Sequence, residues 1–236
     1  MTAGNVRQTG QRYRKRRPLP ALLFILVLGI VASIVWLKVM TSDSDVTGAA
    51  HCDPPPAQAA PTTPATEAPP SPATLGKPQE TNFLDRAVPT PPDRVLVRVL
   101  NASNTRGAAG MVTETLRTLG FTQVAEPDND AIYGDEMTCR AQIRFGPQGE
   151  AAARTLSLVE PCAELVRDDR QDATVDLAIG DSFDDLNPNN HARTALEQLA
   201  AWALQNPPDQ GGLQAEGAPQ PKLEASLLTG ARSVRC

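Results

Sequence analysis

Hydrophobic and polar positions divide the chain into one long apolar run near its start and a series of shorter patterns from residue 93 onward. The run Ala21–Leu37 contains no charged side chain and extends past Lys38 to Met40. Twenty helical residues span roughly 30 Å, about the hydrocarbon thickness of a bilayer. A basic stretch from Arg12 to Arg17 precedes the run, and the Lys/Arg excess marks the cytoplasmic side. The pattern predicts a cytoplasmic tail over 1–20, a transmembrane signal anchor over 21–40 and an exterior remainder.

Two alternatives to an uncleaved anchor are a cleaved signal peptide and a lipoprotein. A signal peptide has a small-residue cleavage site just after its apolar core, but Trp36–Met40 close the core here and Gly48-Ala49-Ala50 lies too far downstream. Acylation of Cys52 would need a small residue before it, and His51 occupies that position. The uncleaved anchor is therefore the favoured interpretation.

The patterns between residues 93 and 184 alternate between strand and helix periods. Strands are expected over Val95–Leu100, near Thr122–Glu126, and over Ala141–Phe145, Glu164–Arg167 and Val175–Ile179. One helix is expected from about Gly107 to Leu119, with Gly120 as its left-handed cap and Phe121 folding back onto it. A second helix is expected from Gln148 to Val159, where Pro161 stops it.

The predicted order β-α-β-β-α-β-β indicates an α/β fold. Right-handed crossovers place both helices on one face of the sheet. We therefore expect a two-layer sandwich with a mixed sheet of about five strands and two helices, preceded by the transmembrane helix. About ninety residues are enough for one hydrophobic core.

The segments on either side of this domain have different compositions. Residues 41–92 are expected to form an exterior linker rich in Pro, Ala and Thr, which would reach roughly 60 Å if its proline-rich part is extended. Residues 185–236 are expected to form a C-terminal extension with one amphipathic helix over 192–205. After it, 205–221 has the composition of a disordered segment, and 223–236 is expected to form a short helix and tail.

The distribution of charge along the chain limits the classes of molecule that the exterior part could bind. The whole chain carries a formal net charge of −5, and its basic excess is concentrated before the apolar run, so the exterior part is strongly acidic. Nucleic-acid phosphates require a basic face. The charge pattern therefore excludes a nucleic-acid partner and argues against tight docking on anionic lipid headgroups.

The four cysteines are Cys52, Cys139, Cys162 and Cys236. Their spacing includes no C-x-x-C pair, so a zinc site is not expected. Exterior thiols tend to oxidise, and four cysteines allow three pairings. Position along the chain favours Cys139 with Cys162, both inside the predicted domain, and Cys52 with Cys236, one at each edge. Free buried thiols are the alternative.

Several residues whose side chains could take part in a reaction or a modification also have a structural explanation. His51 and His191 lie in a linker and at a helix start, where solvated side chains are expected. Ser103 lacks the G-x-S-x-G context of a nucleophile and suits a helix cap. Asn101-Ala102-Ser103 is a formal glycosylation sequon but is expected to form a turn.

Two further features could bind ions. Gly107 and Gly110 at a helix start could bind an anion, but close packing of helix and strand explains them as well. An acidic group without a calcium-loop pattern is expected to form a solvated rim: Asp168, Asp169, Asp172, Asp181, Asp184 and Asp185. The sequence predicts no catalytic, cofactor-binding or metal-binding residue.

An ordered set of motifs between Arg94 and Phe183 resembles the LytR C-terminal domain family. The motifs are Val97–Ser103, Gly107, Gly110, Leu119–Phe121, Ile143–Gly146 and Val175–Gly180. A narrower group within the family is indicated by Cys-Asp-Pro-Pro-Pro at 52–56, by the runs 139–146 and 159–162, and by the terminal cysteine, because ordinary members lack the two internal cysteines. The resemblance implies an accessory role in maintaining the cell envelope, since the glycopolymer-transferring domain that often accompanies this family is not found before residue 93.

Together these observations predict a non-enzymatic, membrane-anchored exterior protein that binds another envelope protein. A module that binds peptidoglycan or a wall glycopolymer is the alternative. Sugar faces usually stack on aromatic rings, and in the predicted exterior part only Trp202 and Tyr133 are suited to this. A hydrolase is the least favoured class.

Overall fold

The computed structural model describes residues 28–33, 51–56, 74–207 and 219–236. The chain divides into two compact units, Met1–Ser44 and Asp45–Cys236. In the first unit residues 28–33 are helical, and the rest of the predicted anchor over 21–40 lies outside the described residues. No helix within the described ranges is both long enough and apolar enough to span a membrane.

Within the described part of the second unit, six strands form one mixed sheet. Their order across the sheet is β1-β5-β4-β6-β2-β3. The strands are β1 (Lys77–Gln79), β2 (Val97–Asn101), β3 (Asp128–Asn129), β4 (Ala141–Phe145), β5 (Glu164–Arg167) and β6 (Val175–Ile179). β4 runs parallel to β5 and antiparallel to β6, while β2 runs parallel to both β6 and β3.

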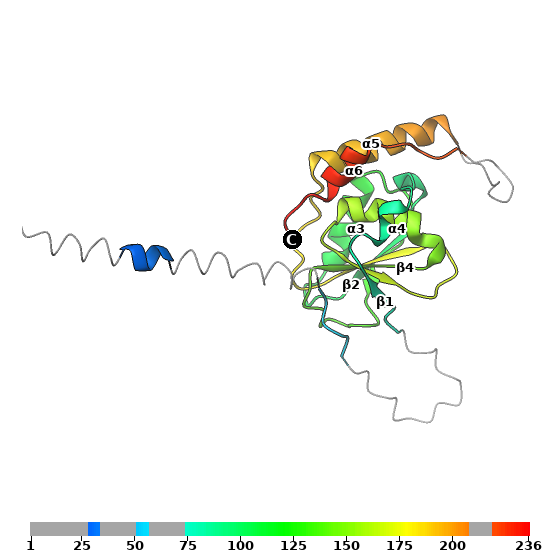
Figure 1. Ribbon diagram of the computed structural model, residues 1–236. Coiled ribbons are helices and arrows are strands. Elements are labelled where there is room, and N and C mark those ends of the chain that lie inside the picture. Colours follow the sequence, from blue (N-terminus) through cyan, green and yellow to red (C-terminus); the bar gives the residue numbers. More distant parts are fainter. Residues whose placement is uncertain (1–27, 34–50, 57–73, 208–218) are drawn as a thin grey trace, which may run out of the picture. The chain divides into compact units, whose positions relative to one another are not determined.

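The helices of this unit all lie on one side of the sheet, as Figure 1 shows. They are α3 (Ala108–Thr118), α4 (Glu150–Val159), α5 (Asn190–Gln205) and α6 (Ala225–Arg232). α3 packs on β2 and α4 on β4, whereas α5 and α6 pack on each other and on α4. The expected α/β class and the placement of both domain helices on one face are confirmed, and α5 and α6 add a further layer beyond them (Figure 1).

Local sequence patterns predicted the bounds of several elements closely. β4, β5 and β6 have the bounds expected from their apolar patterns. Gly120 has a φ of 95°, and its N–H donates to the carbonyl of Arg117 at 3.1 Å. The N–H of Phe121 returns to the carbonyl of Leu116 at 3.1 Å. This pair of bonds is the Schellman motif, which ends α3.

The sheet has one strand more than expected because of differences at its two edges. Near Thr122–Glu126 the chain makes only an isolated bridge between Val97 and Val124, and the edge strand β3 forms two residues later instead. At the other edge, β1 pairs antiparallel with β5. Lys77-Pro78-Gln79 has no apolar alternation, so its composition gave no strand signal.

Residues 77–92, which composition assigned to the linker, are part of the fold. Besides β1 they form the 3-10 helix Phe83–Arg86, and a second 3-10 helix, Pro92–Arg94, follows. Leu84 is buried in the main core. Phe83 packs against the same core, Asp85 pairs with Arg154 of α4, and the N–H of Thr90 donates to the carbonyl of Ala151 at 3.1 Å. These long-range contacts, which composition does not record, hold the segment on the domain.

The main core lies between the sheet and the helices. It consists of the helix-facing side chains of the strands together with the inner faces of α3 and α4, including Val99, Ile143, Leu156 and Leu177. A separate apolar cluster joins α4, α5 and α6 through Leu158, Ala192, Ala195 and Ala231. The C-terminal extension is therefore packed onto the domain.

Candidate functional site

The side of the sheet opposite the helices, called here the helix-free face, carries charged and polar side chains. Strand pairing aligns Arg98 of β2 with Asp176 of β6, and Asp176 with Arg144 of β4. In the next row Leu100, Ala178, Gln142 and Glu164 follow one another across four strands. The alternation of Gln142 and Arg144 with apolar residues along β4 is typical of a strand with one exposed face, but every residue of β4 is buried.

Asp176 holds two arginines together on this face. Arg98 donates to it through Nε and Nη2, at 2.9 and 3.0 Å, and Arg170 donates to Oδ2 at 2.8 Å. Arg170 also binds Asp168, at 2.6 Å from Nη2 to Oδ2. Two guanidinium groups and two carboxylates thus alternate in one cluster, so that each charge is compensated by its neighbours.

This arrangement fixes the protonation state of the cluster. Burial alone would raise the pKa of Asp176, but the hydrogen bonds from Arg98 and Arg170 outweigh it and leave that pKa below its ordinary value. For Arg170, desolvation acts to lower the pKa, and the bonds to Asp168 and Asp176 raise it above the ordinary value. Asp176 therefore stays ionised at neutral pH and is a poor proton donor.

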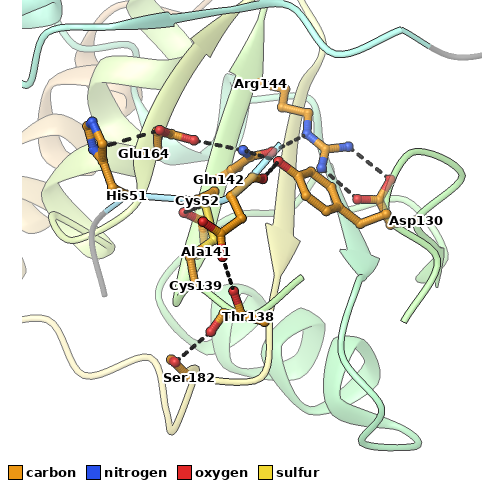
Figure 2. The surroundings of a disulfide bond; sticks show 12 residues. His51, Cys52, Asp130, Thr138, Cys139, Ala141, Gln142, Arg144, Glu164 and Ser182 are labelled. Atoms are coloured by element: carbon orange, nitrogen blue, oxygen red, sulfur yellow. Dashed lines mark hydrogen bonds and ion pairs between the residues drawn. A yellow bond between two sulfur atoms is a disulfide. The ribbon is translucent and has the colours of Figure 1, made fainter. Parts of the chain in front are cut away.

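A second polar network lies deeper on the same face. Arg144 forms a bidentate pair with Asp130, at 2.9 and 2.6 Å, and the two side chains are 3% and 1% exposed. Arg144 also donates to Gln142 Oε1 at 2.9 Å, and Gln142 Nε2 donates to Glu164 at 2.8 Å. Figure 2 shows this chain of bonds running from Asp130 to Glu164. The loop that contains Asp130 therefore covers the polar centre of the sheet.

The N-terminal segment 51–56 is attached beside this network by a disulfide. Cys52 is bonded to Cys139, which lies two residues before the start of β4 and is buried in a small cluster with Leu100, Tyr133 and Met137. A second disulfide joins Cys162, after α4, to Cys236, after α6. All four cysteines are thus paired, as disulfides rather than free thiols.

The predicted pairing of Cys139 with Cys162 and Cys52 with Cys236 is therefore wrong. β4 and β5 are parallel neighbours, so both internal cysteines do lie at the same end of adjacent strands. Side-chain direction decides between the partners: Cys139 packs into the cluster on the helix-free face, whereas Cys162 reaches the tail after α6. Position along the chain contains no information about this direction.

A cleft opens at the end of the helix-free face beside β1, next to the Asp176 cluster. Its volume is about 1020 Å³. Strand β1, the start of β2 and the loop between β5 and β6 line it. Several of the lining side chains carry a charge or an amide: Lys77, Gln79, Arg98, Gln123, Arg167, Asp168, Asp169, Arg170 and Asp172. A smaller cavity of about 240 Å³ lies between this cluster and Asp130. Both are places where the described surface could receive a ligand or a polypeptide.

The acidic residues expected to form one rim are distributed over several contacts. Asp168 pairs with Arg170, Asp184 with Arg140, and Asp181 accepts the N–H of Asn104 at 3.0 Å. Asp169 and Asp172 line the cleft. Among the described residues, no three His, Cys, Asp or Glu side chains are grouped closely enough to hold a metal ion.

The other candidate residues have structural contacts. His51 is exposed, with Nδ1 3.9 Å from Glu164 Oε1, and the ring of His191 lies against Gly230, where a Cβ would approach it to 2.8 Å. Ser103 accepts the N–H of Thr105 and donates to Asn101 Oδ1. Asn101-Ala102-Ser103 is thus part of a turn, and the helix cap expected here is formed instead by Gly107, at a φ of 78°.

Several residues of the helix-free face were missed by sequence reasoning, notably Asp130, Arg144, Arg170 and Asp176. Their signal was the presence of opposite charges within otherwise apolar strands, at Arg144 and Asp176. A charge in a short buried strand requires a partner, and this requirement could have predicted the pairing of the strands that contain them.

Comparison with known proteins identifies the family to which this chain belongs. Residues 94–183 match the family model described as LytR cell envelope-related transcriptional attenuator, LytR_C. The chain is 37% identical over 199 residues to the cell envelope integrity protein Cei of Mycobacterium tuberculosis, a match that covers 83% of this chain and 87% of Cei. The chain belongs to the Cei family. This confirms the resemblance to the LytR C-terminal domain family and the narrower group that the cysteines indicated.

A solved structure extends the comparison. The soluble domain of a conserved hypothetical secreted protein from Mycobacterium marinum is similar to this chain with a TM-score of 0.57 and 34% identity, covering 70% of this chain and all of that one. Neither the name of Cei nor the description of the M. marinum protein denotes a catalytic activity. Family membership therefore associates the chain with the cell envelope and leaves its molecular role to be argued from the site.

Proposed function

We propose that this protein is a membrane-anchored, extracytoplasmic accessory protein that contributes to cell envelope integrity by binding another envelope protein without catalysing a reaction. Membership of the Cei family supports the envelope role. The two disulfides support an oxidising exterior compartment, because disulfides persist there and are rare in the cytosol. The basic stretch before Ala21–Leu37 supports an anchor with its N-terminus in the cytoplasm.

One observation carries the non-catalytic part of this proposal. On the helix-free face, Asp130 and Asp176 are held by bidentate bonds from arginines. A general acid or base needs a carboxyl group whose pKa lies near the working pH, and the arginines shift the pKa of Asp176 in the opposite direction. A fixed set of compensated charges beside a wide cleft is suited to recognition of a polar partner surface.

Binding of peptidoglycan or a wall glycopolymer is the second candidate function. The amide and cationic groups of Gln79, Gln123 and Arg167 in the cleft favour it, since such groups bond to sugar hydroxyls and carboxylates. Against it, the cleft residues in the described chain include no aromatic side chain on which a sugar could stack. Tyr133 is buried beneath Asp53 and Trp202 lies in α5, away from the cleft lining.

A pair of binding experiments separates the two candidates. Purified exterior protein is sedimented with isolated cell wall, and the full chain is crosslinked in intact cells. If the partner is a protein, we expect a specific crosslinked product and no co-sedimentation with the cell wall. Co-sedimentation with the cell wall would support glycan binding instead. Lys77→Glu in the cleft should weaken whichever interaction is found at least several-fold. Arg106→Glu, exposed before α3 and outside the cleft lining, is the matched control.

The proposed topology has its own test. Protease added to spheroplasts should digest the C-terminal domain, while residues 1–20 stay protected. Protection of the domain until detergent is added would contradict an exterior location.

A further inference from the structure

The chain joins the folded domain at Cys52, well before the first strand. Cys52 is covalently bonded to Cys139 across a sequence separation of 87 residues. Cys139 precedes β4, a central strand of the sheet, and is 2% exposed. A pull on the N-terminal part of the chain would therefore be transmitted to the centre of the sheet and not to the edge strand β1.

Non-covalent contacts hold the same segment in place. The hydroxyl of Tyr133 donates to the carbonyl of Asp53 at 2.8 Å, and Thr138 Oγ1 donates to Asp53 Oδ2 at 3.3 Å. Cys52 also packs against the cluster of Leu100, Tyr133 and Met137. Figure 2 shows Cys52 lying between the polar network and the loop around Thr138, with His51 beside Glu164 at one end of the network. The disulfide thus belongs to a docked segment with several contacts.

This attachment changes which part of the sequence acts as the spacer. Between Met40 and Cys52 there are about a dozen residues, which span at most roughly 40 Å when fully extended. Without the disulfide and these contacts, the spacer would continue through the Pro-rich sequence as far as β1, a contour length of roughly 120 Å. The Pro-rich sequence 57–73 lies between two points that the structure fixes, Cys52 and β1.

We infer that the Cys52–Cys139 disulfide sets the reach of this domain: residues 41–51 form the tether, and the Pro-rich segment is a closed side loop that contributes nothing to it. The inference rests on the membrane anchor of the proposed function. It follows that the helix-free face is restricted to a shell close to the membrane, so that its protein partner is membrane-proximal. The expected 60 Å spacer function of residues 53–73 is replaced by this shorter tether.

Insertions at two positions test the inference in the intact chain. About twenty Gly/Ser residues are inserted after Asp45 in one variant and after Ala65 in the other, and each full-length protein is placed in liposomes. Energy transfer is measured from a dye at position 204, where Leu204 is 86% exposed on α5, to acceptor lipids. The insertion after Asp45 should increase the root-mean-square span of the tether about 1.6-fold and lower the transfer. The insertion after Ala65 should leave the transfer unchanged.

The possible outcomes of this experiment test the tether and the membrane anchor separately. Equal loss of transfer from both insertions would show that the Pro-rich segment is part of the tether and would overturn the inference. No change from either would also overturn it, because something other than the chain would then set the distance. Failure of the wild-type protein to float with the liposomes would remove the anchor, and with it both the inference and the proposed topology.

Disulfide variants provide a second, independent test. In the double variant Cys52→Ala/Cys139→Ala, the insertion after Ala65 should begin to lower the transfer, because the spacer then extends toward β1. In the control variant Cys162→Ala/Cys236→Ala, which removes the other disulfide, that insertion should remain without effect. The same response in both double variants would contradict the inference.

Discussion

The two faces of the sheet are made from the same strands but are buried in different ways. Toward the helices, Ile143 and Leu177 pack in a continuous apolar core. On the opposite face their neighbours Arg144 and Asp176 are also buried, at 2% and 3% exposure, but each is covered by hydrogen-bonded partners of opposite charge. The stability of the helix-covered face comes from apolar area removed from water. The stability of the helix-free face requires that every buried charge has a partner of opposite charge. The first tolerates small changes in shape, and the second should not tolerate the loss of one partner.

The sharpest test of this difference is removal of one member of the buried pair. Arg144→Met leaves the Asp130 carboxylate unpaired at 1% exposure, and breaking a buried pair in this way costs about 3–5 kcal/mol. The double variant Arg144→Met/Asp130→Asn removes both charges, while the Asn oxygen can still accept the N–H of Ile132. Urea unfolding of the two variants should show that the second substitution restores much of the lost stability.

A matched variant on the same face provides the control. Arg98→Met removes a guanidinium whose side chain is 50% exposed, and Asp176 keeps its bond to Arg170. The loss should be at most about 1 kcal/mol. If Arg98→Met and Arg144→Met destabilise the protein equally, burial of the pair is not what distinguishes them.

The two disulfides should have effects of intermediate size, one on each side of the sheet. Cys52–Cys139 and Cys162–Cys236 close sequence separations of 87 and 74 residues. Because loop-closure entropy changes slowly with length, removing either by Cys→Ala pairs should cost a similar amount, about 2–4 kcal/mol. Thermal and urea unfolding measure this cost, and non-reducing peptide mapping of the wild-type protein checks the pairing first. A Cys139–Cys162 peptide would contradict the structure described above.

On the helix-covered face a small change in shape should have a small effect. Ile143→Val removes one methylene from a fully buried position and is expected to cost about 0.5–1.5 kcal/mol. The residue lies between Gln142 and Arg144 on β4, so the same strand provides the comparison with the polar face. A loss as large as that from Arg144→Met would show that packing on the two faces is equally strict.

The same contrast explains how far sequence reasoning could reach. Elements that bury an apolar stripe against the helices were predicted closely, among them β4, β5, β6 and the capped end of α3 at Gly120, because periodicity records which side chains face a core. The helix-free face was not predicted, since its burial depends on side-chain pairs that periodicity does not record, such as Arg98 with Asp176, which lie 78 residues apart in the sequence. For the same reason, β1 and the pairing of Cys52 with Cys139 left no periodic signal.

The smallest expected effect is a change in the acid dependence of stability, caused by Asp176. Its pKa in the folded protein lies below the ordinary value because Arg98 and Arg170 outweigh burial. The ionised form is therefore favoured by folding, and this stabilisation is fully present above the unfolded value, about 3.9. It is lost as the pH falls through the lower folded pKa. In Asp176→Asn this contribution is absent at every pH.

The free energies of unfolding of wild type and Asp176→Asn, measured from pH 6 down to pH 3, should therefore begin to converge at the acid end. The effect is small in practice, because Asp176 remains ionised over most of the accessible range and only the start of its titration is sampled. Gln171→Ala, an uncharged change at an exposed position in the loop that precedes β6, should run parallel to wild type. Parallel curves for Asp176→Asn as well would mean that the arginines do not hold this carboxylate in its ionised form, and the case against acid–base chemistry on the helix-free face would lose its main support.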